Sequence, residues 1–170
     1  MHKPIAIITG ASTGIGRSLA IKLSEQYLVY LISTNKENLN KTKKLINAQN
    51  NECKIIVSDI SKTKSIDDIY SQIENKEKIE LLINNAGIGL FKSISDTTIE
   101  DWDNTINTNL RGSFLMTKMI IDNLKSKQNG KIVFISSVAG LQPYKNSTAY
   151  VASKFAMRGF AASLREELRD

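Results

Sequence analysis

The chain has 170 residues, 41% of them hydrophobic and 24% charged, and this ordinary globular composition argues against disordered and fibrous classes. A single cysteine, Cys53, leaves no internal disulfide framework, and a single histidine, His2, argues against a histidine triad or a metal cluster. The net charge is +6 and comes from 18 Lys and only five Arg, which is more typical of a solvated surface than of a DNA-reading face.

Seven of the lysines fall between residues 36 and 64 and form one basic stretch. A solvated helix face with loops is one interpretation, and an anionic ligand or surface is the other. No apolar run approaches the ~18 residues that a membrane span needs. The N-terminus enters its first apolar run without the hydrophobic region of a signal peptide, and the thiol of Cys53 is free. We therefore expect a cytoplasmic protein with neither a membrane nor a nucleic-acid partner.

Short β-branched apolar runs alternate with longer stretches of helical spacing along the chain. The predicted strands are Ile5–Ile8, Leu28–Ile32, Lys54–Val57, Leu81–Ile83 and Ile132–Ile135. The predicted helices are Ile15–Gln26, Glu37–Gln49, Ser65–Ile73, Ile99–Lys125 and Thr148–Asp170. Strands without polar alternation are typical of sheets covered on both faces. The alternation predicts an α/β fold with a parallel sheet between two helical layers, a three-layer αβα arrangement.

The last predicted helix, Thr148–Asp170, ends without a glycine, a proline or a capping signal. Strand Ile132–Ile135 would then lie at the edge of the sheet with apolar side chains, which natural folds avoid. We expect residues 1–170 to form a single domain that is incomplete at its C-terminus.

A glycine-rich segment, Thr9–Gly16, follows the first predicted strand and opens the first predicted helix. Gly10 permits a tight turn, Gly14 lets the backbone approach a pyrophosphate, and Gly16 allows close packing of helix and strand. The N–H groups at the helix start would face the phosphates. The spacing is GxxxGxG rather than the usual GxGxxG, and a tight turn in an unrelated α/β protein is the alternative.

The residues after the second predicted strand are the ones expected to contact a ribose. An acidic residue there would hold the 2′-hydroxyl of NAD, but the stretch Ser33-Thr34-Asn35-Lys36 contains none. Its hydroxyls and Lys36 favour the 2′-phosphate of NADP. The alternative is that Lys36 is a solvated residue at a helix start.

Tyr150 and Lys154 lie four residues apart and would share one face of a helix. A phenol has a pKa of about 10, and a nearby ammonium stabilises the phenolate, so the pair can act as general acid and base without histidine. This spacing also occurs by chance on amphipathic helices. Ser137 follows the fifth predicted strand, where a hydroxyl can donate to a substrate carbonyl, although serine commonly ends strands before turns.

Taken together, these motifs resemble the short-chain dehydrogenases/reductases in order and spacing. The resemblance rests on Thr9–Gly16, Asn84–Gly87, Asn109, Ser137 and Tyr150–Lys154, and it extends over essentially all 170 residues. It implies a Rossmann-type, doubly wound parallel sheet that binds NAD(P)(H). It also implies that members continue past the last helix with further strands, which are missing here.

The resemblance implies catalytic roles for four residues. Tyr150 would be the proton donor and acceptor, and Lys154 would lower the pKa of Tyr150 and hold the nicotinamide ribose. Ser137 would bind the substrate oxygen, and Asn109 would support a water-linked proton relay to Lys154. Asn109 could instead bond within its own helix.

The resemblance also implies a set of cofactor contacts. Asp59, with Ile60, would contact the adenine, although Asp59 could simply cap a turn. The segment Asn85–Gly87 would line the adenosine side, and Ile15 would pack near the cofactor. The full expected cofactor-binding set is Gly10, Ser12, Thr13, Gly14, Ile15, Gly16, Ser33, Thr34, Asn35, Lys36, Asp59, Ile60, Asn85, Ala86, Gly87, Tyr150 and Lys154. No metal ligand is expected.

The sequence therefore predicts an oxidoreductase that transfers hydride between NAD(P)(H), with NADP(H) favoured over NAD(H), and a small carbonyl or secondary alcohol substrate. A dinucleotide-binding module without catalysis is the alternative, because the family's substrate-binding half is missing. A basic protein associated with nucleic acid is a third reading. Helices Ile99–Lys125 and Thr148–Asp170 resemble those that pair across the family's dimer, so we expect a homodimer or homotetramer.

Overall fold

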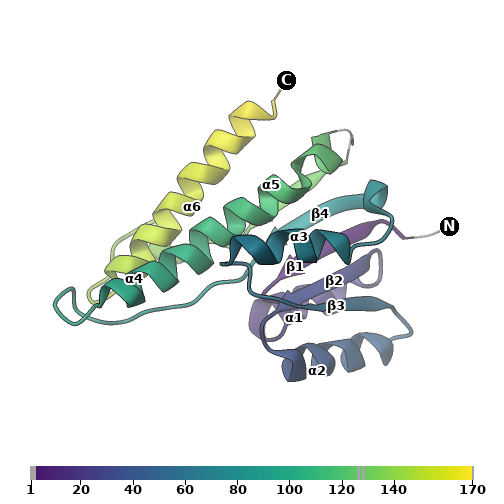
Figure 1. The fold of residues 1–170 in the computed structure, drawn as a ribbon, viewed down its shortest axis with the longest axis horizontal. Coiled ribbons are helices and arrows are strands. Elements are labelled where there is room, and N and C mark those ends of the chain that lie inside the picture. The colour runs from purple at the N-terminus through teal and green to yellow at the C-terminus, as the bar shows by residue number, and fades with distance from the viewer. Residues whose placement is uncertain (1–2, 126, 128, 170) are drawn as a thin grey trace.

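The computed structural model describes residues 3–125, 127 and 129–169, so His2 and Asp170 lie outside the described residues. Five parallel strands form one sheet in the order β3-β2-β1-β4-β5 (Figure 1). The strands are β1 (Ile5–Thr9), β2 (Leu28–Ser33), β3 (Cys53–Val57), β4 (Ile79–Asn84) and β5 (Lys131–Phe134). The predicted parallel α/β sheet is confirmed, and β5 lies at its edge as expected.

The helices cover both faces of this sheet. They are α1 (Gly14–Leu23), α2 (Lys36–Asn47), α3 (Thr63–Ser71), α4 (Ile99–Ile106), α5 (Gly112–Lys125) and α6 (Thr148–Glu167). Three short segments join them: η1 (Lys76–Lys78), η2 (Asn107–Arg111) and η3 (Val138–Gly140). Helices α1 and α2 pack on one face, α3 and α5 on the other, and α6 lies along α4 and η2.

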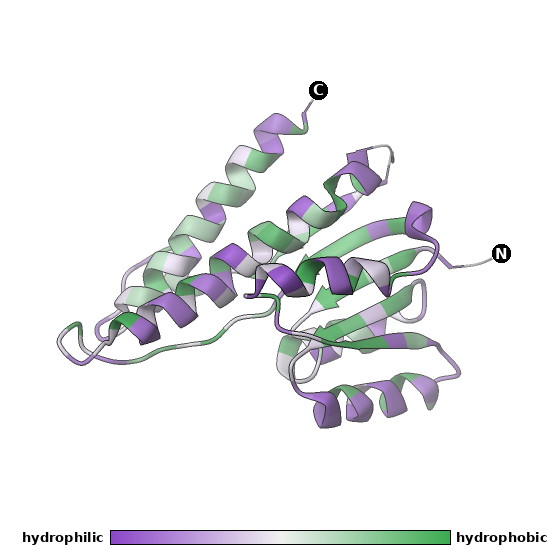
Figure 2. Cartoon of the chain, viewed as in Figure 1, coloured by the Kyte–Doolittle hydropathy of each residue, from purple (hydrophilic) through white to green (hydrophobic). Residues whose placement is uncertain are grey.

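Each face of the sheet has its own hydrophobic core. Ile8 and Leu31 point toward α1 and α2, while Ile7 and Tyr30 point toward α3 and α5, and all four are almost fully buried. Because successive strand residues point to opposite faces, a sheet covered on both sides needs apolar residues at every position. Figure 2 shows the consequence: the strands are hydrophobic along their length, whereas the outer surface of α2 is hydrophilic.

Cys53 lies in one of these cores at the start of β3. Its side chain is buried, and the lost hydration of the thiolate raises the pKa of the thiol to about 11. A thiol with such a pKa carries almost no thiolate at neutral pH, so Cys53 contributes packing rather than reactivity.

The predicted single helix Ile99–Lys125 is wrong in one respect. Helix α4 begins with a capping box in which Thr98 Oγ1 accepts from the Asp101 N–H and Asp101 accepts from the Thr98 N–H. The π-helical segment η2 then separates α4 from α5. A π turn inserts one residue without breaking the helix, so an apolar pattern read over many residues does not reveal it.

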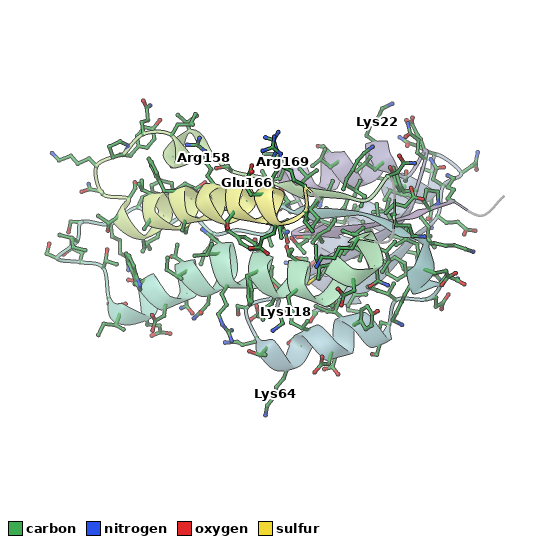
Figure 3. All side chains as sticks on the ribbon, turned by 90° about the horizontal axis from the view of Figure 1, so that it is seen from above. Lys22, Lys64, Lys118, Arg158, Glu166 and Arg169 are labelled. Carbon is green, nitrogen blue, oxygen red and sulfur yellow. The ribbon has the colours of Figure 1, made fainter. Side chains whose placement is uncertain are left out.

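The positive charge is not gathered on one face of the molecule. Lys22 on α1 and Lys64 on α3 project from opposite sides of the sheet (Figure 3). Lys22 is paired with Glu25 just after α1, and Lys41 is paired with Glu37 on α2. None of the helices in the described part of the chain is long and apolar enough to cross a membrane.

Candidate active site

A cavity of about 520 Å³ lies at the carboxyl ends of β1, β2 and β4. Ligands of open α/β sheets bind outside the carboxyl ends of the strands, so this is the expected position for a site. The residues of the predicted cofactor-binding set that line it are Gly10, Ser12, Thr13, Gly14, Ile15, Ser33, Thr34, Asp59, Ile60, Asn85, Ala86 and Gly87. Ile32, Ser58, Ile88 and Thr108 line it as well, and the sequence reading missed them although each adjoins a residue that it named.

The glycine segment has the backbone shape that its sequence predicts. Gly10 and Gly14 have φ angles of +65° and +53°, which side chains other than glycine rarely tolerate. A Cβ on Gly10 would lie 2.8 Å from the Cα of Ala86, so the turn touches the chain that follows β4. A Cβ on Gly14 would meet nothing within 4 Å, which leaves this backbone open to a close approach.

Asn85 ties the glycine segment to the end of β4. Its Nδ2 donates to the carbonyl oxygens of Thr9 and Gly10 at 3.0 and 3.1 Å, and its backbone N–H donates to Thr9 Oγ1 at 3.0 Å. Thr9 Oγ1 also accepts from the Ala86 N–H at 3.0 Å. These bonds hold the two sides of the cavity at a set distance before any ligand enters.

Helix α1 points its N-terminus at this cavity without a capping side chain. Thr13 is in the N-cap position, yet its side chain makes no capping hydrogen bond, and the first turn carries no acidic residue. The first N–H groups of a helix lack partners within the helix, and the helix dipole favours an anion beside them. The arrangement can therefore hold a phosphate group.

The four residues from the end of β2 into α2, Ser33 to Lys36, separate into a pair that lines the cavity and a pair that does not. Ser33 Oγ donates to Ser12 Oγ at 3.0 Å, and Ser33 and Thr34 line the cavity. Asn35 instead caps α2, because its Oδ1 accepts from the Asn38 N–H at 2.9 Å. Lys36 lines a different groove, beside the outer edge of β3. The structure therefore does not bring Asn35 and Lys36 to the cavity.

Two other predicted cofactor residues serve the local structure. Gly16 is buried under the glycine segment rather than lining the cavity, and a Cβ there would overlap the carbonyl oxygen of Gly10. Asp59 does cap a turn, since its Oδ1 accepts from the Ser61 N–H at 2.9 Å. Asp59 also lines the cavity, so it can cap this turn and contact a ligand at the same time.

Lys154 is buried in α6 with its ammonium next to Tyr150. The Nζ atom donates to the carbonyl oxygen of Ile135 at 2.8 Å and lies 5.8 Å from the centre of the Tyr150 ring. Only 4% of Lys154 is exposed, and this loss of hydration lowers the pKa of the ammonium. A cation held so close to a phenol can stabilise the phenolate.

Asn109 is fully buried in the π-helical segment η2 and has three hydrogen bonds. Its Oδ1 accepts from the Ile88 N–H at 2.8 Å, and its Nδ2 donates to Ile88 O and Ser153 Oγ, both at 3.0 Å. It thus fastens α6 to the chain after β4. A Cβ on Gly87 would lie 3.3 Å from Asn109 Oδ1 and 3.7 Å from Lys154 Nζ, so only glycine leaves this gap open.

Ser137 follows β5 and begins the short helical segment η3. Its Oγ accepts from the Ala139 N–H at 3.1 Å, which leaves the hydroxyl proton for another acceptor. Arg158 of α6 donates to the carbonyl oxygen of Gly140 at 2.7 Å and holds η3 against α6 (Figure 3). The predicted catalytic residues are therefore gathered where β4 and β5 end and α6 begins.

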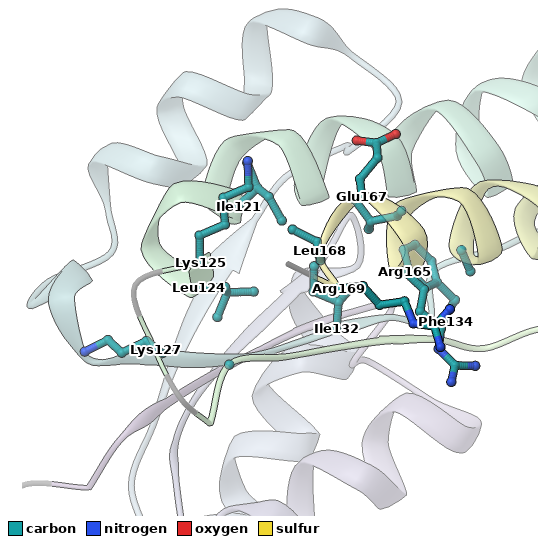
Figure 4. Close-up of a pocket in the computed structure, with 13 residues that line it drawn as sticks. Ile121, Leu124, Lys125, Lys127, Ile132, Phe134, Arg165, Glu167, Leu168 and Arg169 are labelled. Atoms are coloured by element: carbon teal, nitrogen blue, oxygen red, sulfur yellow. The ribbon is translucent and has the colours of Figure 1, made fainter.

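A larger cavity of about 730 Å³ lies away from this site, between α5, β5 and α6 (Figure 4). Ile132, Phe134, Leu164 and Leu168 line it, and it contains none of the predicted site residues. Within the residues that the structure describes, no group of three His, Cys, Asp or Glu side chains could hold a metal ion.

Lys154→Met should change how stability depends on pH. The lysine has an ordinary pKa of 10.5 in the unfolded chain and a lower one when folded, so between these values the unfolded state binds more protons. The free energy of unfolding contributed by Lys154 therefore rises with pH in that window. We expect the stability of the wild type, relative to Lys154→Met, to increase from pH 7 toward pH 10.5 in urea unfolding. A difference independent of pH would show that burial does not perturb this ammonium.

Comparison with known proteins agrees with this geometry. A family model described as short chain dehydrogenase matches residues 4–170. The chain is 32% identical to an uncharacterized oxidoreductase of Staphylococcus epidermidis, covering 99% of this chain and 73% of that protein. It is 34% identical to the sepiapterin reductase of Chlorobaculum tepidum, covering 96% of this chain and 70% of that protein. The crystal structure of a metagenomic short-chain oxidoreductase in complex with NADP is similar with a TM-score of 0.92 and 31% identity, covering 99% of this chain and 78% of that one.

Proposed function

Because the chain belongs to the short chain dehydrogenase family, we propose that it transfers hydride between NAD(P)(H) and a carbonyl or secondary alcohol substrate. The observation that carries this proposal is the buried Lys154 ammonium, 5.8 Å from the centre of the Tyr150 ring, at the same edge of the sheet as the glycine cavity. A solvated lysine on a chance amphipathic helix would not be buried in this way.

The glycine cavity fits a dinucleotide. The open backbone at Gly14 and the uncapped start of α1 would hold the pyrophosphate, and the Asn85 hydrogen bonds keep this cradle in place. When bound, the cofactor would donate a hydride to the substrate carbon in reduction and accept one from it in oxidation. Asp59 and Ile60 would lie along the adenine, and Lys154 would hold the ribose next to the nicotinamide.

The preference for NADP(H) over NAD(H) rests on the end of β2. Ser12, Ser33 and Thr34 line the cavity there, and the segment Ser33–Lys36 contains no carboxylate to bind a 2′-hydroxyl or repel a 2′-phosphate. Three hydroxyl groups can donate to phosphate oxygens. Lys36 would add only a more distant positive charge, because it lines another groove.

In the catalytic step, the Tyr150 hydroxyl would give its proton to the substrate oxygen during reduction and recover it during oxidation. The Lys154 ammonium would stabilise the phenolate that this transfer leaves. The Ser137 hydroxyl would donate to the same substrate oxygen and stabilise its developing charge. Asn109 would support a water-linked proton relay to Lys154 and keep α6 in register with the chain after β4.

A fluorescence titration with NADPH, and with NADH in parallel, tests the cofactor assignment. We expect saturable binding of both and at least tenfold tighter binding of NADPH, because the segment Ser33–Lys36 at the end of β2 offers hydroxyls and no carboxylate to the 2′-phosphate. Equal affinities would contradict the NADP(H) preference. Saturable binding without turnover of any ketone, aldehyde or secondary alcohol would favour a dinucleotide-binding module instead, and no binding to either nucleotide would overturn both assignments.

A further inference from the structure

Two loops lie at one end of the molecule, where α4 and α6 begin (Figure 1). The first, residues 85–98, joins β4 to α4, and the second, residues 135–147, joins β5 to α6. A parallel β-bridge between Lys92 and Ser147 fastens the two loops together. Ser147 is the N-cap residue of α6, three positions before Tyr150 in the first turn of that helix. The bridge therefore holds the first loop, which carries Phe91 beside the Tyr150 ring, against the second loop at the start of α6.

Both loops expose large apolar side chains. On the first loop Phe91 is 72% exposed, and its ring centre lies 6.0 Å from that of Tyr150. On the second loop Leu141 is 64% exposed, and Val138 and Tyr144 are also exposed. Side chains of this size are normally buried, and several of them exposed together on two bridged loops, one of them beside Tyr150, indicate a surface that binds apolar matter.

The charges nearby are already engaged. Lys92 pairs with Asp101 at 2.7 Å, and Arg158 is bonded to the carbonyl oxygen of Gly140. The Lys154 ammonium is buried against Ile135 O. Binding a carboxylate or phosphate on a substrate takes a cation that can reach it, typically arginine. The cations on these two loops, all of whose residues the structure describes, are Lys92, which pairs with Asp101, and Lys145, a single exposed lysine.

We propose that the substrate is a ketone or aldehyde whose carbonyl carries an uncharged apolar chain or ring, and that Phe91 is a specificity-determining residue. This inference rests on the proposed function. The carbonyl oxygen would accept from the Tyr150 and Ser137 hydroxyls, and the apolar group would lie against Phe91 and Leu141. Hydride to the carbonyl carbon and the Tyr150 proton to its oxygen give the alcohol, with NADPH oxidised to NADP⁺. Apolar surface removed from water supplies the binding energy.

The test is a panel of carbonyl compounds assayed with NADPH: 2-octanone and acetophenone as apolar substrates, dihydroxyacetone and pyruvate as polar and charged ones. We expect kcat/KM to be at least tenfold higher for the apolar pair. Phe91→Ala should lower kcat/KM for 2-octanone about tenfold or more and change that for dihydroxyacetone less than threefold. Phe114→Ala is the matched control, because Phe114 is a half-exposed phenylalanine that pairs with Phe160 on the far part of α6, and it should leave both values unchanged.

A higher kcat/KM for pyruvate or dihydroxyacetone would overturn the inference while leaving the proposed function standing. If no compound is turned over, a second measurement tests the apolar substrate site separately from the proposed reaction. Octanamide has the shape of an apolar ketone but cannot be reduced by NADPH, so its binding to the NADPH complex can be measured by calorimetry. Saturable binding that Phe91→Ala weakens at least fivefold would support the apolar site even if the proposed reaction fails, and absence of binding would reject it.

Discussion

Tyr150→Phe should lower kcat by about 10²- to 10⁴-fold and leave the dissociation constant for NADPH within threefold of the wild type. The substitution removes one hydroxyl and keeps the aromatic ring. The centre of that ring lies 6.0 Å from the ring centre of Phe91 and 5.8 Å from Lys154 Nζ. The substrate oxygen then loses its proton donor, while the glycine segment and the start of α1 are untouched. Steady-state kinetics with 2-octanone and a parallel NADPH titration measure the two effects.

Tyr27→Phe is the control for this experiment. Tyr27 follows α1 and packs against the core on the α1 and α2 face, away from the candidate site, so its hydroxyl has no part in the proposed chemistry. It should retain the kcat of the wild type. If Tyr150→Phe turned over substrate at the wild-type rate, Tyr150 would not be the proton donor, and the proposed mechanism would lack its general acid and base.

Gly16→Ala is expected to destabilise the chain by about 1–3 kcal/mol and to weaken NADPH binding at least tenfold. A Cβ at this position would overlap the carbonyl oxygen of Gly10 and lie 2.5 Å from Asn85 Nδ2. Relief of that overlap must push α1 away from β1 or break the hydrogen bond from Asn85 to Gly10 O. Either movement displaces the backbone that would hold the pyrophosphate. Urea unfolding and the NADPH titration measure the two effects.

Gly159→Ala makes the same change on another helix and should do the opposite. Gly159 lies within α6, and a Cβ there would meet nothing within 4 Å. Alanine in a helix interior is more stable than glycine by about 0.5–1 kcal/mol, so the free energy of unfolding should increase by that amount with no change in NADPH affinity. If Gly16→Ala behaved like Gly159→Ala, the close packing of α1 on the glycine segment would have no role in the site.

The strands are the elements whose predicted bounds lie nearest to those in the structure. Each predicted strand agrees with the structure to within two residues at either end, because the sheet is covered on both faces and every strand position had to be apolar. The helix ends were less well placed, and the π turn at Asn109 was missed. A helix pattern averages over several turns, so the one residue that a π turn inserts leaves the pattern almost unchanged. In the structure Asn109 within that turn bonds to Ile88, 21 residues earlier in the chain.

The lysine stretch shows why composition alone is a weak guide to ligand contacts. Thr34 and Lys36 are two residues apart, yet Thr34 lines the cavity and Lys36 lines a groove on the outer edge of β3. Asn35 lies between them and caps α2. The chain turns from strand to helix at this cap, so neighbouring residues point in different directions, and no spacing in the sequence records that turn.

The sequence by itself determined the class of sheet, the glycine turn and the pair Tyr150 and Lys154, because these depend on local patterns: apolar runs, positions that need positive φ angles, and a four-residue helical spacing. Only the tertiary structure decided that Lys154 is buried beside the Tyr150 ring and that Asn109 joins α6 to the chain after β4. It also decided that Phe91, on a loop bridged to the start of α6, lies beside Tyr150. The physical reason is distance along the chain. The contacts Asn109–Ser153, Lys92–Ser147 and Phe91–Tyr150 join residues 44, 55 and 59 positions apart. They form only when the sheet brings the carboxyl ends of its strands together.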